Sequence, residues 1–557
     1  MRADARLARP GHAIALAAAI HLAALALMLW SETGLPAFIA FCLTWGLLNS
    51  FWAMALRRPL AAAALSLAMI VTLILLARLK QSVLFTTIDF VDVMIVDTDT
   101  IAFLLTIFPN LGWTVAIIAA LALPAFALLW WLDPMRVRVP VAALSFAGCL
   151  AALVGLSAVA PRDPHNDFVD REYVSKFARS GVTAIAEYFN RGLLESDRAA
   201  VGRLRPAASA ACQPAGKPPN IVVVFDESSF DISAIPNIKV PSGYRQHFVS
   251  LDGESRAFVV EGIGGPSWFT EYNVLTGLSV RSYGRFADFV TRIAVGRVQR
   301  GLAYNLRWCG YRTYSLYPTH GAFLSARGFQ TTAGIEHFLD MKGLGATTIE
   351  ADSFYYDAAA WTIAGARGDG PLFLLVYTAI NHFPWTIRYR PDLLPEWRDP
   401  GNGIEVDEYI RRQSMSARAY SEFKRRLAQD FPSDAFLIVR FGDHLPLFAP
   451  YMFYPGMDAA LRAQHIAALD PQLRTTYYAI DAVNFRPADL SSAHDRLDAP
   501  YLPLVTLEAA GLSLDSTFAE QKRIFRRCPG DFYRCENGAA ARRFNRLLID
   551  AGLIKGL

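Results

Sequence analysis

Three apolar stretches of the sequence each end in side chains that bind metals or move protons. After "IVVVF", "FLLVYTAI" and "AFLIVRFG" come the pairs Asp226–Glu227, Asn381–His382 and Asp443–His444. Carboxylate oxygens and imidazole nitrogens are typical ligands of zinc and manganese. The strands of a parallel sheet bring their carboxyl ends to one crevice, so these side chains are expected to converge there. The pattern predicts a metal site, although any one pair alone could be an ordinary polar loop.

A fourth segment, "GIGGPSWFTEYNVLTGL" (262–278), offers a hydroxyl group. Its glycines lead to Ser267, and a helix-compatible run then continues to Gly277. We expect Ser267 to be the N-cap residue of this helix. Beside a divalent metal at a helix N-terminus, such a hydroxyl would lose its proton readily and attack a phosphate. Thr270, one turn later, is the alternative nucleophile, and a helix cap without chemistry is the structural alternative.

These groups require a rigid scaffold, which the sequence predicts from about residue 219 onward. Strand-like runs alternate there with helical stretches; the runs are "NIVVVFD", "FVVEGI", "RTYSLYP", "LFLLVYT" and "AFLIVRF". Runs such as "FLLVY" are apolar on both faces, as in a sheet that is covered on both sides. The alternation predicts an α/β domain with a mainly parallel sheet over residues 219–557.

The first 160 residues have a different character. The whole chain is 53% hydrophobic and 19% charged, whereas globular domains carry about 25% charged residues. Five apolar runs are long enough to cross a bilayer: 13–30, 36–55, 60–77, 111–132 and 140–160. We therefore predict a bundle of five transmembrane helices over residues 1–160, followed by a helical connector and linker over 161–218. The net charge of +4 and the lack of a basic run with interleaved aromatics argue against nucleic acid.

Short loops predict the orientation of these spans. Arginines precede the first span and occupy the loops after the second and fourth spans, at positions 2, 6, 9, 57, 58, 136 and 138. Because an excess of Lys and Arg marks the cytoplasmic side, the N-terminus is predicted to be cytoplasmic. An odd number of spans then places everything after residue 160 outside the cytoplasm. Residues 78–110 contain four aspartates and are predicted to form an amphipathic helix at the outer interface, since a crossing would bury carboxylates.

Four cysteines lie in the predicted external part, where disulfides can form: Cys212, Cys309, Cys528 and Cys535. Cys528 and Cys535 enclose the short loop "PGDFYR", and we favour a bridge between them. Two free thiols are the alternative for this pair.

The order of motifs resembles the alkaline-phosphatase superfamily. The motifs are "ES" after the first strand, "GGPSWFTEYNVLTG", "HG" with a following Arg, "NHFPW" and "FGDHLP". Within that superfamily the chain is similar to the membrane branch of lipoteichoic acid synthases, phosphoglycerol transferases and phosphoethanolamine transferases. The resemblance covers nearly the whole chain. It implies five spans before an external sulfatase-like α/β sandwich with a mainly parallel central sheet.

The same resemblance implies the residues of a catalytic metal site. Glu227, Ser267, Asp443 and His444 match the ligands of one divalent metal, Zn²⁺ or Mn²⁺. Ser267 is also the implied nucleophile, at a position where the family usually has threonine. The choice between zinc and manganese stays open.

Four further residues receive roles from the resemblance or from their place beside the motifs. His382 would bind the phosphoryl group of the substrate, and Arg327 would line the substrate pocket. Ser325 stands where the family has a tryptophan, so the head-group contact is not carried over. Asp226 and His320 are expected to support the site through hydrogen bonds.

The function implied is transfer of a phospholipid head group, of phosphoglycerol or phosphoethanolamine type, at the bacterial inner membrane. Ser267 would attack the phosphorus, release diacylglycerol and form a phospho-seryl intermediate. The head group would then pass to an envelope glycan or lipid. A phosphodiesterase or phosphatase that uses water is the alternative. A sulfatase is less well matched, because "WFTE" follows Ser267 where sulfatases have a C/S-x-P-x-R pattern. A non-enzymatic sensor would be expected to lack some of the ligands.

Overall fold

The structure is a computed structural model, and it divides the chain into two compact units, Met1–Asn190 and Arg191–Leu557. Each unit has buried apolar clusters of its own. The residues described are 10–84, 87–160, 171–200, 202–206, 211–214, 216–368, 370–458, 461, 464–465 and 468–556.

The first unit contains five helices that are long and apolar enough to cross a membrane. They are α1 (Pro10–Ser31), α2 (Leu35–Leu56), α3 (Pro59–Leu84), α6 (Leu111–Leu132) and α7 (Val139–Val159). Large apolar side chains point outward from them, and Trp113 and Leu144 are 74% and 77% exposed. Helices that are apolar all round suit a lipid environment rather than water. The five predicted spans are therefore confirmed as helices of spanning length.

The loops after α2 and α6 lie together at one end of this bundle. Asp133 Oδ2 accepts hydrogen bonds from the backbone N–H groups of Leu60 and Ala61, at 2.8 and 3.2 Å. A carboxylate from one loop thus caps the start of α3. Val137 N–H also donates to the carbonyl of Arg57 at 3.1 Å. The two arginine-bearing loops were predicted to lie on the same side of the membrane, and they lie together. That this side is the cytoplasmic one stays a prediction.

Residues 78–110 do not form the single amphipathic helix that was predicted. Two short helices, α4 (Phe90–Met94) and α5 (Thr98–Ile107), occupy most of this segment after the end of α3. Asp89 and Asp97 are their N-cap residues, and each side chain accepts a backbone N–H group of the first turn. The prediction was wrong because it assigned these aspartates to a polar helix face, whereas they begin new helices.

Part of the range predicted to be a connector, 161–218, is the helix α8 (Tyr173–Arg191). Its start is fixed by Glu32, from the loop between α1 and α2. Glu32 accepts hydrogen bonds from Val174 N–H at 3.1 Å and from the Ser175 hydroxyl at 2.5 Å. Negative charge at a helix N-terminus is stabilising. The first ten residues of the predicted connector, 161–170, lie outside the described residues.

The second unit is built on an eight-stranded sheet with the order β4-β3-β5-β1-β6-β7-β2-β8. The strands are β1 (Asn220–Asp226), β2 (Arg256–Val259), β3 (Arg312–Leu316), β4 (His337–Leu339), β5 (Leu372–Tyr377), β6 (Phe436–Gly442), β7 (Thr475–Val483) and β8 (Arg496–Asp498). The run from β4 to β6 is parallel, and β7 is antiparallel to both β6 and β2. The prediction of a mainly parallel sheet is confirmed, although β4, β7 and β8 were not predicted.

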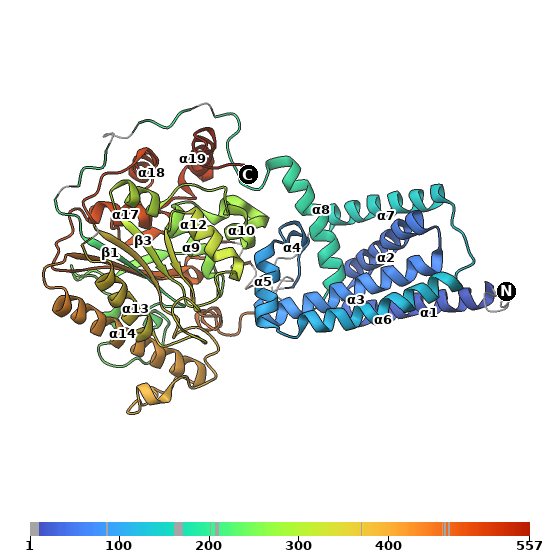
Figure 1. The fold of residues 1–557 in the computed structure, drawn as a ribbon, viewed down its shortest axis with the longest axis horizontal. Helices are drawn as coiled ribbons and strands as arrows, with labels where there is room; N and C mark the ends of the chain where they lie inside the picture. Colours follow the sequence, from blue (N-terminus) through green and yellow to red (C-terminus); the bar gives the residue numbers. More distant parts are fainter. Residues whose placement is uncertain are drawn as a thin grey trace. The chain divides into compact units, whose positions relative to one another are not determined.

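Helices cover both faces of this sheet. Figure 1 shows α13 (Asp352–Gly365) and α14 (Ile404–Asp430) on one side of it, and α9 (Ser267–Thr276), α12 (Ala326–Thr332) and α17 (Leu502–Ala509) on the other. Val222 and Val224 of β1 pack with residues of α13 and α14, and both are fully buried. The remaining helices are α10 (Val290–Ala294), α11 (Leu302–Trp308), α15 (Ala449–Phe453), α18 (Ser516–Arg527) and α19 (Ala539–Asp550). Because helices cover both faces of the sheet, its central strands carry apolar side chains on both sides.

Two disulfides are present in the second unit. Cys528–Cys535 closes the short loop that the sequence analysis favoured. Cys212–Cys309 joins the segment before β1 to the end of α11. Such bridges are typical of proteins outside the reducing cytosol.

Gly442, the last residue of β6, allows a close backbone contact. A Cβ atom at this position would overlap the carbonyl oxygen of Ser229. We predict that Gly442→Ala lowers the free energy of unfolding by about 1–3 kcal/mol, since overpacking forces the backbone apart. Thermal unfolding of the purified full chain measures this change.

The matched control is Gly365→Ala at the end of α13, where an added Cβ would meet nothing within 4 Å. Alanine at this helical position is expected to be neutral or to stabilise by at most about 1 kcal/mol. Equal stabilities of the two variants would contradict the assigned contact at Gly442.

Candidate active site

The ends of β1 and β6 bring three potential metal ligands together. The two strands are paired in register, with Asp226 beside Gly442, so the residues that follow them are neighbours. Glu227, Asp443 and His444 each offer a ligand atom, and these atoms all lie within 4.8 Å of one another. His444 Nε2 is 3.3 Å from Asp443 Oδ2 and 3.6 Å from Glu227 Oε1. The three residues are called the ligand cluster below.

Ser267 joins the ligand cluster from α9. Its Oγ lies 3.2 Å from Glu227 Oε2 and 3.2 Å from His444 Nε2. The residue before α9 is Pro266, and Ser267 is the first helical residue, with no side-chain cap bond. The predicted N-cap role was therefore wrong, because the hydroxyl bonds to the carboxylate instead of its own helix. Gly264, with φ of 60°, supplies the left-handed turn that leads into α9.

The donor set fits a divalent cation. The Nδ1 atom of His444 lies 2.9 Å from the carbonyl oxygen of Leu445, so it carries the proton and leaves the Nε2 lone pair toward the ligand cluster. Asp443 Oδ1 accepts the N–H groups of Ser228 and His444, at 2.7 and 2.9 Å. Its Oδ2, 3.3 Å from His444 Nε2, is buried and has no hydrogen-bond partner among the described residues. Burial and the nearby Glu227 carboxylate raise the pKa of Asp443 well above its ordinary value. A cation would satisfy the free oxygen and relieve this repulsion.

Backbone conformation around Ser228 serves the ligand cluster. Ser228 has φ of 50°, a left-handed conformation that is uncommon for residues other than glycine. Its N–H group binds Asp443, and its hydroxyl donates to Glu227 Oε1 at 2.8 Å. Asn381, at the end of β5, donates to the carbonyl of Ser228 at 3.4 Å and to Gln413 at 3.0 Å. Ser228 and Gln413 are supporting residues that the sequence analysis missed, and no spacing signal distinguishes them.

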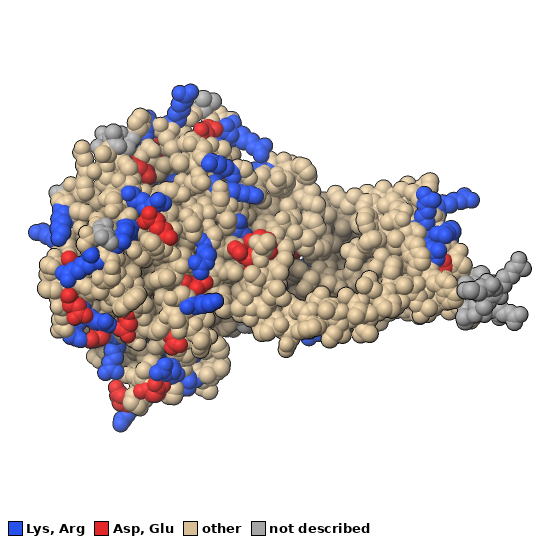
Figure 2. All heavy atoms as spheres, viewed as in Figure 1, with Lys and Arg blue, Asp and Glu red and all other residues tan. Residues whose placement is uncertain are grey.

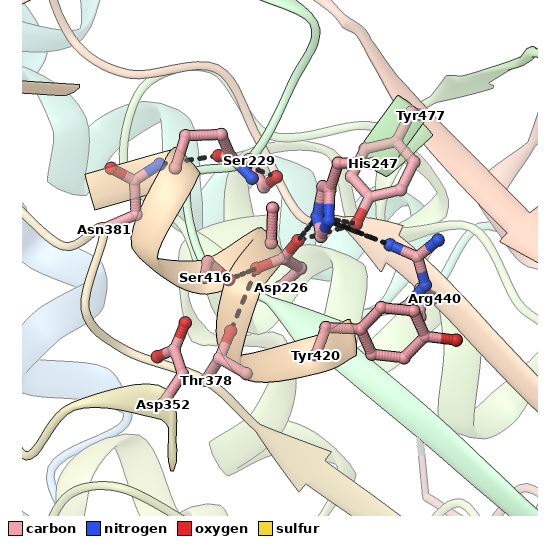
Figure 3. Close-up of polar contacts among 12 residues, drawn as sticks. Asp226, Ser229, His247, Asp352, Thr378, Asn381, Ser416, Tyr420, Arg440 and Tyr477 are labelled. Atoms are coloured by element: carbon pink, nitrogen blue, oxygen red, sulfur yellow. Dashed lines mark hydrogen bonds and ion pairs between the residues drawn. The ribbon is translucent and has the colours of Figure 1, made fainter. Parts of the chain in front are cut away.

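Asp226 is oriented into a separate buried network. Figure 3 shows its carboxylate among Thr378, Ser416, His247 and Tyr477. Oδ2 contacts His247 Nε2 at 3.0 Å and the Tyr477 hydroxyl at 2.6 Å, and Oδ1 accepts from Thr378 at 3.0 Å. Burial alone would raise the pKa of Asp226, but hydrogen bonds from His247 and Tyr477, with the charges of His247 and Arg440, together hold the pKa below its ordinary value. Asp226 can support Glu227 only through the backbone that they share.

Thr270 and His382 differ in their surroundings. Thr270 is fully buried, and its hydroxyl donates to the carbonyl of Asp443 at 2.7 Å. It therefore anchors α9 to the ligand cluster and does not present a free hydroxyl. His382 is partly buried; its Nδ1 lies 2.8 Å from the carbonyl oxygen of Phe383, and its ring stacks on that of Phe383. Within the described part of the chain, no hydrogen bond or ion pair is recorded between His382 and the ligand cluster.

Arg327 and His320 lie on either side of the strained turn before α12. Arg327 pairs with Asp340 at 2.6 Å, and its side chain is 51% exposed. Leu324 and Ser325, between them, both have positive φ, and Ser325 is buried. His320 is partly buried, and its carbonyl accepts the N–H of Phe323 at 2.9 Å. The substrate role of Arg327 and the supporting role of His320 stay predictions.

Removing one carboxylate should reveal the cation site. We predict that Asp443→Asn lowers the affinity of the full chain for Zn²⁺ or Mn²⁺ by at least about tenfold, because a neutral amide is a poorer ligand. In chelator-treated protein the same substitution should raise the unfolding temperature, since it removes the repulsion with Glu227. Metal titration and thermal unfolding test the two effects.

Asp495→Asn is the control, because Asp495 is an exposed carboxylate outside the ligand cluster. It should change neither metal affinity nor the unfolding temperature appreciably. Unchanged metal affinity in Asp443→Asn would refute the assignment of the cation site.

A second prediction concerns Glu271, one turn beyond Ser267. Its carboxyl is buried and accepts from Gln330 Nε2 at 2.9 Å, and burial raises its pKa to about 8. Since the folded state binds this proton more tightly than the unfolded state, stability should fall as pH rises from about 4.5 through about 8. Glu271→Gln should remove this part of the pH dependence. Denaturant unfolding at several pH values measures it, and an identical pH slope in variant and wild type would contradict it.

Several solved structures are similar to this chain. No protein-family model and no curated protein sequence matches the chain. The phosphoglycerol transferase GacH of Streptococcus pyogenes is similar in structure, with 16% identity, a TM-score of 0.48, and coverage of 62% of this chain and 88% of that one. The phosphoethanolamine transferase EptA of Neisseria meningitidis is 14% identical with a TM-score of 0.42, over 86% of this chain and 96% of that one. An alkaline-phosphatase-superfamily protein of Vibrio parahaemolyticus is 15% identical with a TM-score of 0.40, over 66% and 75%. These are likenesses of fold alone.

Proposed function

We propose that this protein is a membrane-anchored phosphotransferase that moves a phospholipid head group onto an acceptor in the cell envelope. The observation that carries the proposal is the position of Ser267 Oγ, 3.2 Å from both Glu227 and His444. A serine hydroxyl at the start of a helix and beside two potential metal ligands is suited to nucleophilic attack on phosphorus. The partial exposure of Ser267 leaves the hydroxyl open to a substrate.

Glu227, Asp443, His444 and Ser267 would hold one divalent cation, Zn²⁺ or Mn²⁺. When bound, the cation lowers the pKa of a coordinated hydroxyl and neutralises charge on phosphoryl oxygens. The residues of this chain do the positioning. His444 is held in one tautomer by Leu445, and the Asp443 carboxylate by two N–H groups. The ligand set is therefore preorganised for its task.

The proposed reaction has two steps. In the first, Ser267 Oγ forms a bond to the head-group phosphorus, and the bond from phosphorus to the diacylglycerol oxygen breaks. The serine proton passes to the hydrogen-bonded Glu227, and diacylglycerol leaves after taking a proton from solvent. In the second, an acceptor hydroxyl attacks the phosphorus of the phospho-seryl group and releases its proton to solvent. The Ser267 Oγ–phosphorus bond breaks, and Ser267 Oγ takes back the proton that Glu227 holds. Thr270 keeps α9 fixed through both steps by its bond to the Asp443 carbonyl.

We further propose that His382 and Arg327 bind oxygens of the transferred phosphoryl group. Arg327 is suited to this because its side chain is 51% exposed, and Asp340 engages only part of its guanidinium. Anchoring by the five apolar helices would keep the site at a lipid surface. The arginine-bearing loops support a cytoplasmic N-terminus, and the two disulfides support an extracytoplasmic catalytic unit.

Ser267→Ala tests the proposed nucleophile. We expect loss of at least about 10³-fold in transfer of a radiolabelled head group from phospholipid, because no covalent intermediate can form. Thr270→Val is the matched control. It should cost about 1 kcal/mol of stability by leaving the Asp443 carbonyl unpaired, yet retain the nucleophile and most of the activity.

The products separate the two reactions that this site could catalyse. Label that appears on an envelope glycan or lipid supports transfer, whereas label that appears only as a free head-group phosphate indicates hydrolysis by the same Ser267. Full activity of Ser267→Ala together with loss in Thr270→Val would overturn the assigned nucleophile.

A further inference from the structure

The second unit contains a groove lined by arginine residues. The segments that form this groove differ from those that carry the ligand cluster. The volume of the groove is about 250 Å³, and it is formed by the segment before β1 together with α18 and α19. Five arginines line it, with one acidic residue: Arg203, Arg205, Arg527, Arg543, Arg546 and Glu520. No residue of β1, β6 or α9 contributes to it. We call it the arginine groove.

The fold builds this groove from parts that are distant in the sequence. The segment before β1 is fixed to α19 by backbone bonding, since Asp197 N–H donates to the carbonyl of Arg542 at 3.1 Å. Asn545 also donates to the carbonyl of Glu195 at 2.8 Å. Arg203 lines the groove together with residues of this helix. The positive charge of the groove is therefore brought together by the tertiary fold and does not come from a basic run on one exposed helix.

The carboxylates nearby do not neutralise the arginines. Arg527 and Arg543 share one acidic partner, Glu536, which is itself partly exposed. Within the described part of the chain, no hydrogen bond or ion pair is recorded for Arg203 or Arg205. Exposed pairs of this kind contribute little energy and can be exchanged for a ligand. Figure 2 shows Lys and Arg side chains over the region of α18 and α19, with acidic side chains between them.

The remaining pairs involve Arg546 and Glu520. Arg546 pairs with Asp550 one turn away at 2.8 Å, and Glu520 pairs with Arg523. Glu520 is thus directed to an arginine of its own helix. The groove is lined by more guanidinium groups than carboxylates, an arrangement that an anion would stabilise.

The chemistry of the lining indicates which anion. All basic residues of the groove are arginines, whose planar guanidinium groups bind phosphate through paired N–H donors. Ile524, Phe544 and Leu547 form apolar wall beside them, which weakens the screening of charge by water. The volume is below the about 300–1,000 Å³ of pockets for drug-sized ligands, so it suits a group of head-group size.

We propose that the arginine groove binds the phosphate group of a small anionic ligand, at a site separate from the ligand cluster. The phosphate could be free in solution or part of a lipid head group, and the chemistry of recognition is the same. This inference stands independently of the proposed head-group transfer, because it uses none of its residues.

Footprinting with an arginine-specific dicarbonyl reagent tests the site residue by residue. The full chain is modified in neutral detergent with inorganic phosphate or with chloride at equal ionic strength, and peptides are quantified by mass spectrometry. Phosphate at about twice its dissociation constant should slow modification of Arg543 and Arg546 by about threefold relative to chloride. Equal protection by chloride would show simple screening and would overturn the proposal.

Two double variants sharpen this test. Arg203→Gln with Arg205→Gln should raise the phosphate concentration that protects Arg543 by about tenfold, since charged hydrogen bonds are lost. Arg398→Gln with Arg486→Gln removes two exposed arginines elsewhere and should leave that concentration unchanged. The same shift in both double variants would overturn the proposal, since it would reflect net charge alone.

The source of the phosphate is distinguished by reconstitution. The full chain is placed in bilayers of phosphatidylglycerol with phosphatidylcholine, or in phosphatidylcholine alone. Protection of Arg543 by phosphatidylglycerol without added phosphate supports a lipid head group, and protection only by added phosphate supports a soluble ligand. Absence of protection in every arm would refute the site.

Discussion

Repulsion between two carboxylates is the constraint around which the second unit is arranged. Glu227 and Asp443 are held together with the lone pair of His444, although burial makes their shared charge costly. The paired ends of β1 and β6 leave them no room to separate. Backbone N–H groups satisfy one oxygen of Asp443, and Ser228 adopts a strained conformation to provide one of them. A sheet buried on both faces supplies the rigidity that such an arrangement needs.

The adjacent residues Asp226 and Glu227 show how one strand end serves two purposes. Asp226 closes a network with His247, Tyr477 and Thr378, and this network ties β1 to β7 and to the end of β5. Glu227 is the carboxylate that faces Ser267. The buried and hydrogen-bonded carboxylate of Asp226 thus anchors the backbone beside Glu227, whose carboxylate belongs to the ligand cluster. A polar core of this kind stabilises one geometry because every member has a partner.

The sequence predicted the elements whose patterns are strong and local. The apolar spans were recognisable by their length. The strands β1, β5 and β6, and with them the residues that follow, were recognisable because burial on both faces leaves a continuous signal. β7 was missed since "TTYYAIDAV" mixes polar and aromatic residues, and its pairing with β6 and β2 is long-range. Asp89 and Asp97 were wrongly assigned to the polar face of one helix. The sequence alone does not distinguish an aspartate on a helix face from an aspartate at an N-cap. Ser267 was assigned the cap for the same reason, since only the fold reveals that Glu227 competes for its hydroxyl.

The hydrogen bond from Thr270 to the Asp443 carbonyl has a consequence for the energetics of the site. The helix that carries Ser267 is attached, one turn later, to the same residue that supplies a cluster carboxylate. The bond couples the positions of α9 and Asp443, and the bonds of Ser267 Oγ to Glu227 and His444 are already present without a substrate. A preorganised site of this type needs little rearrangement when a substrate binds. Its selectivity then depends on which molecules can reach Ser267.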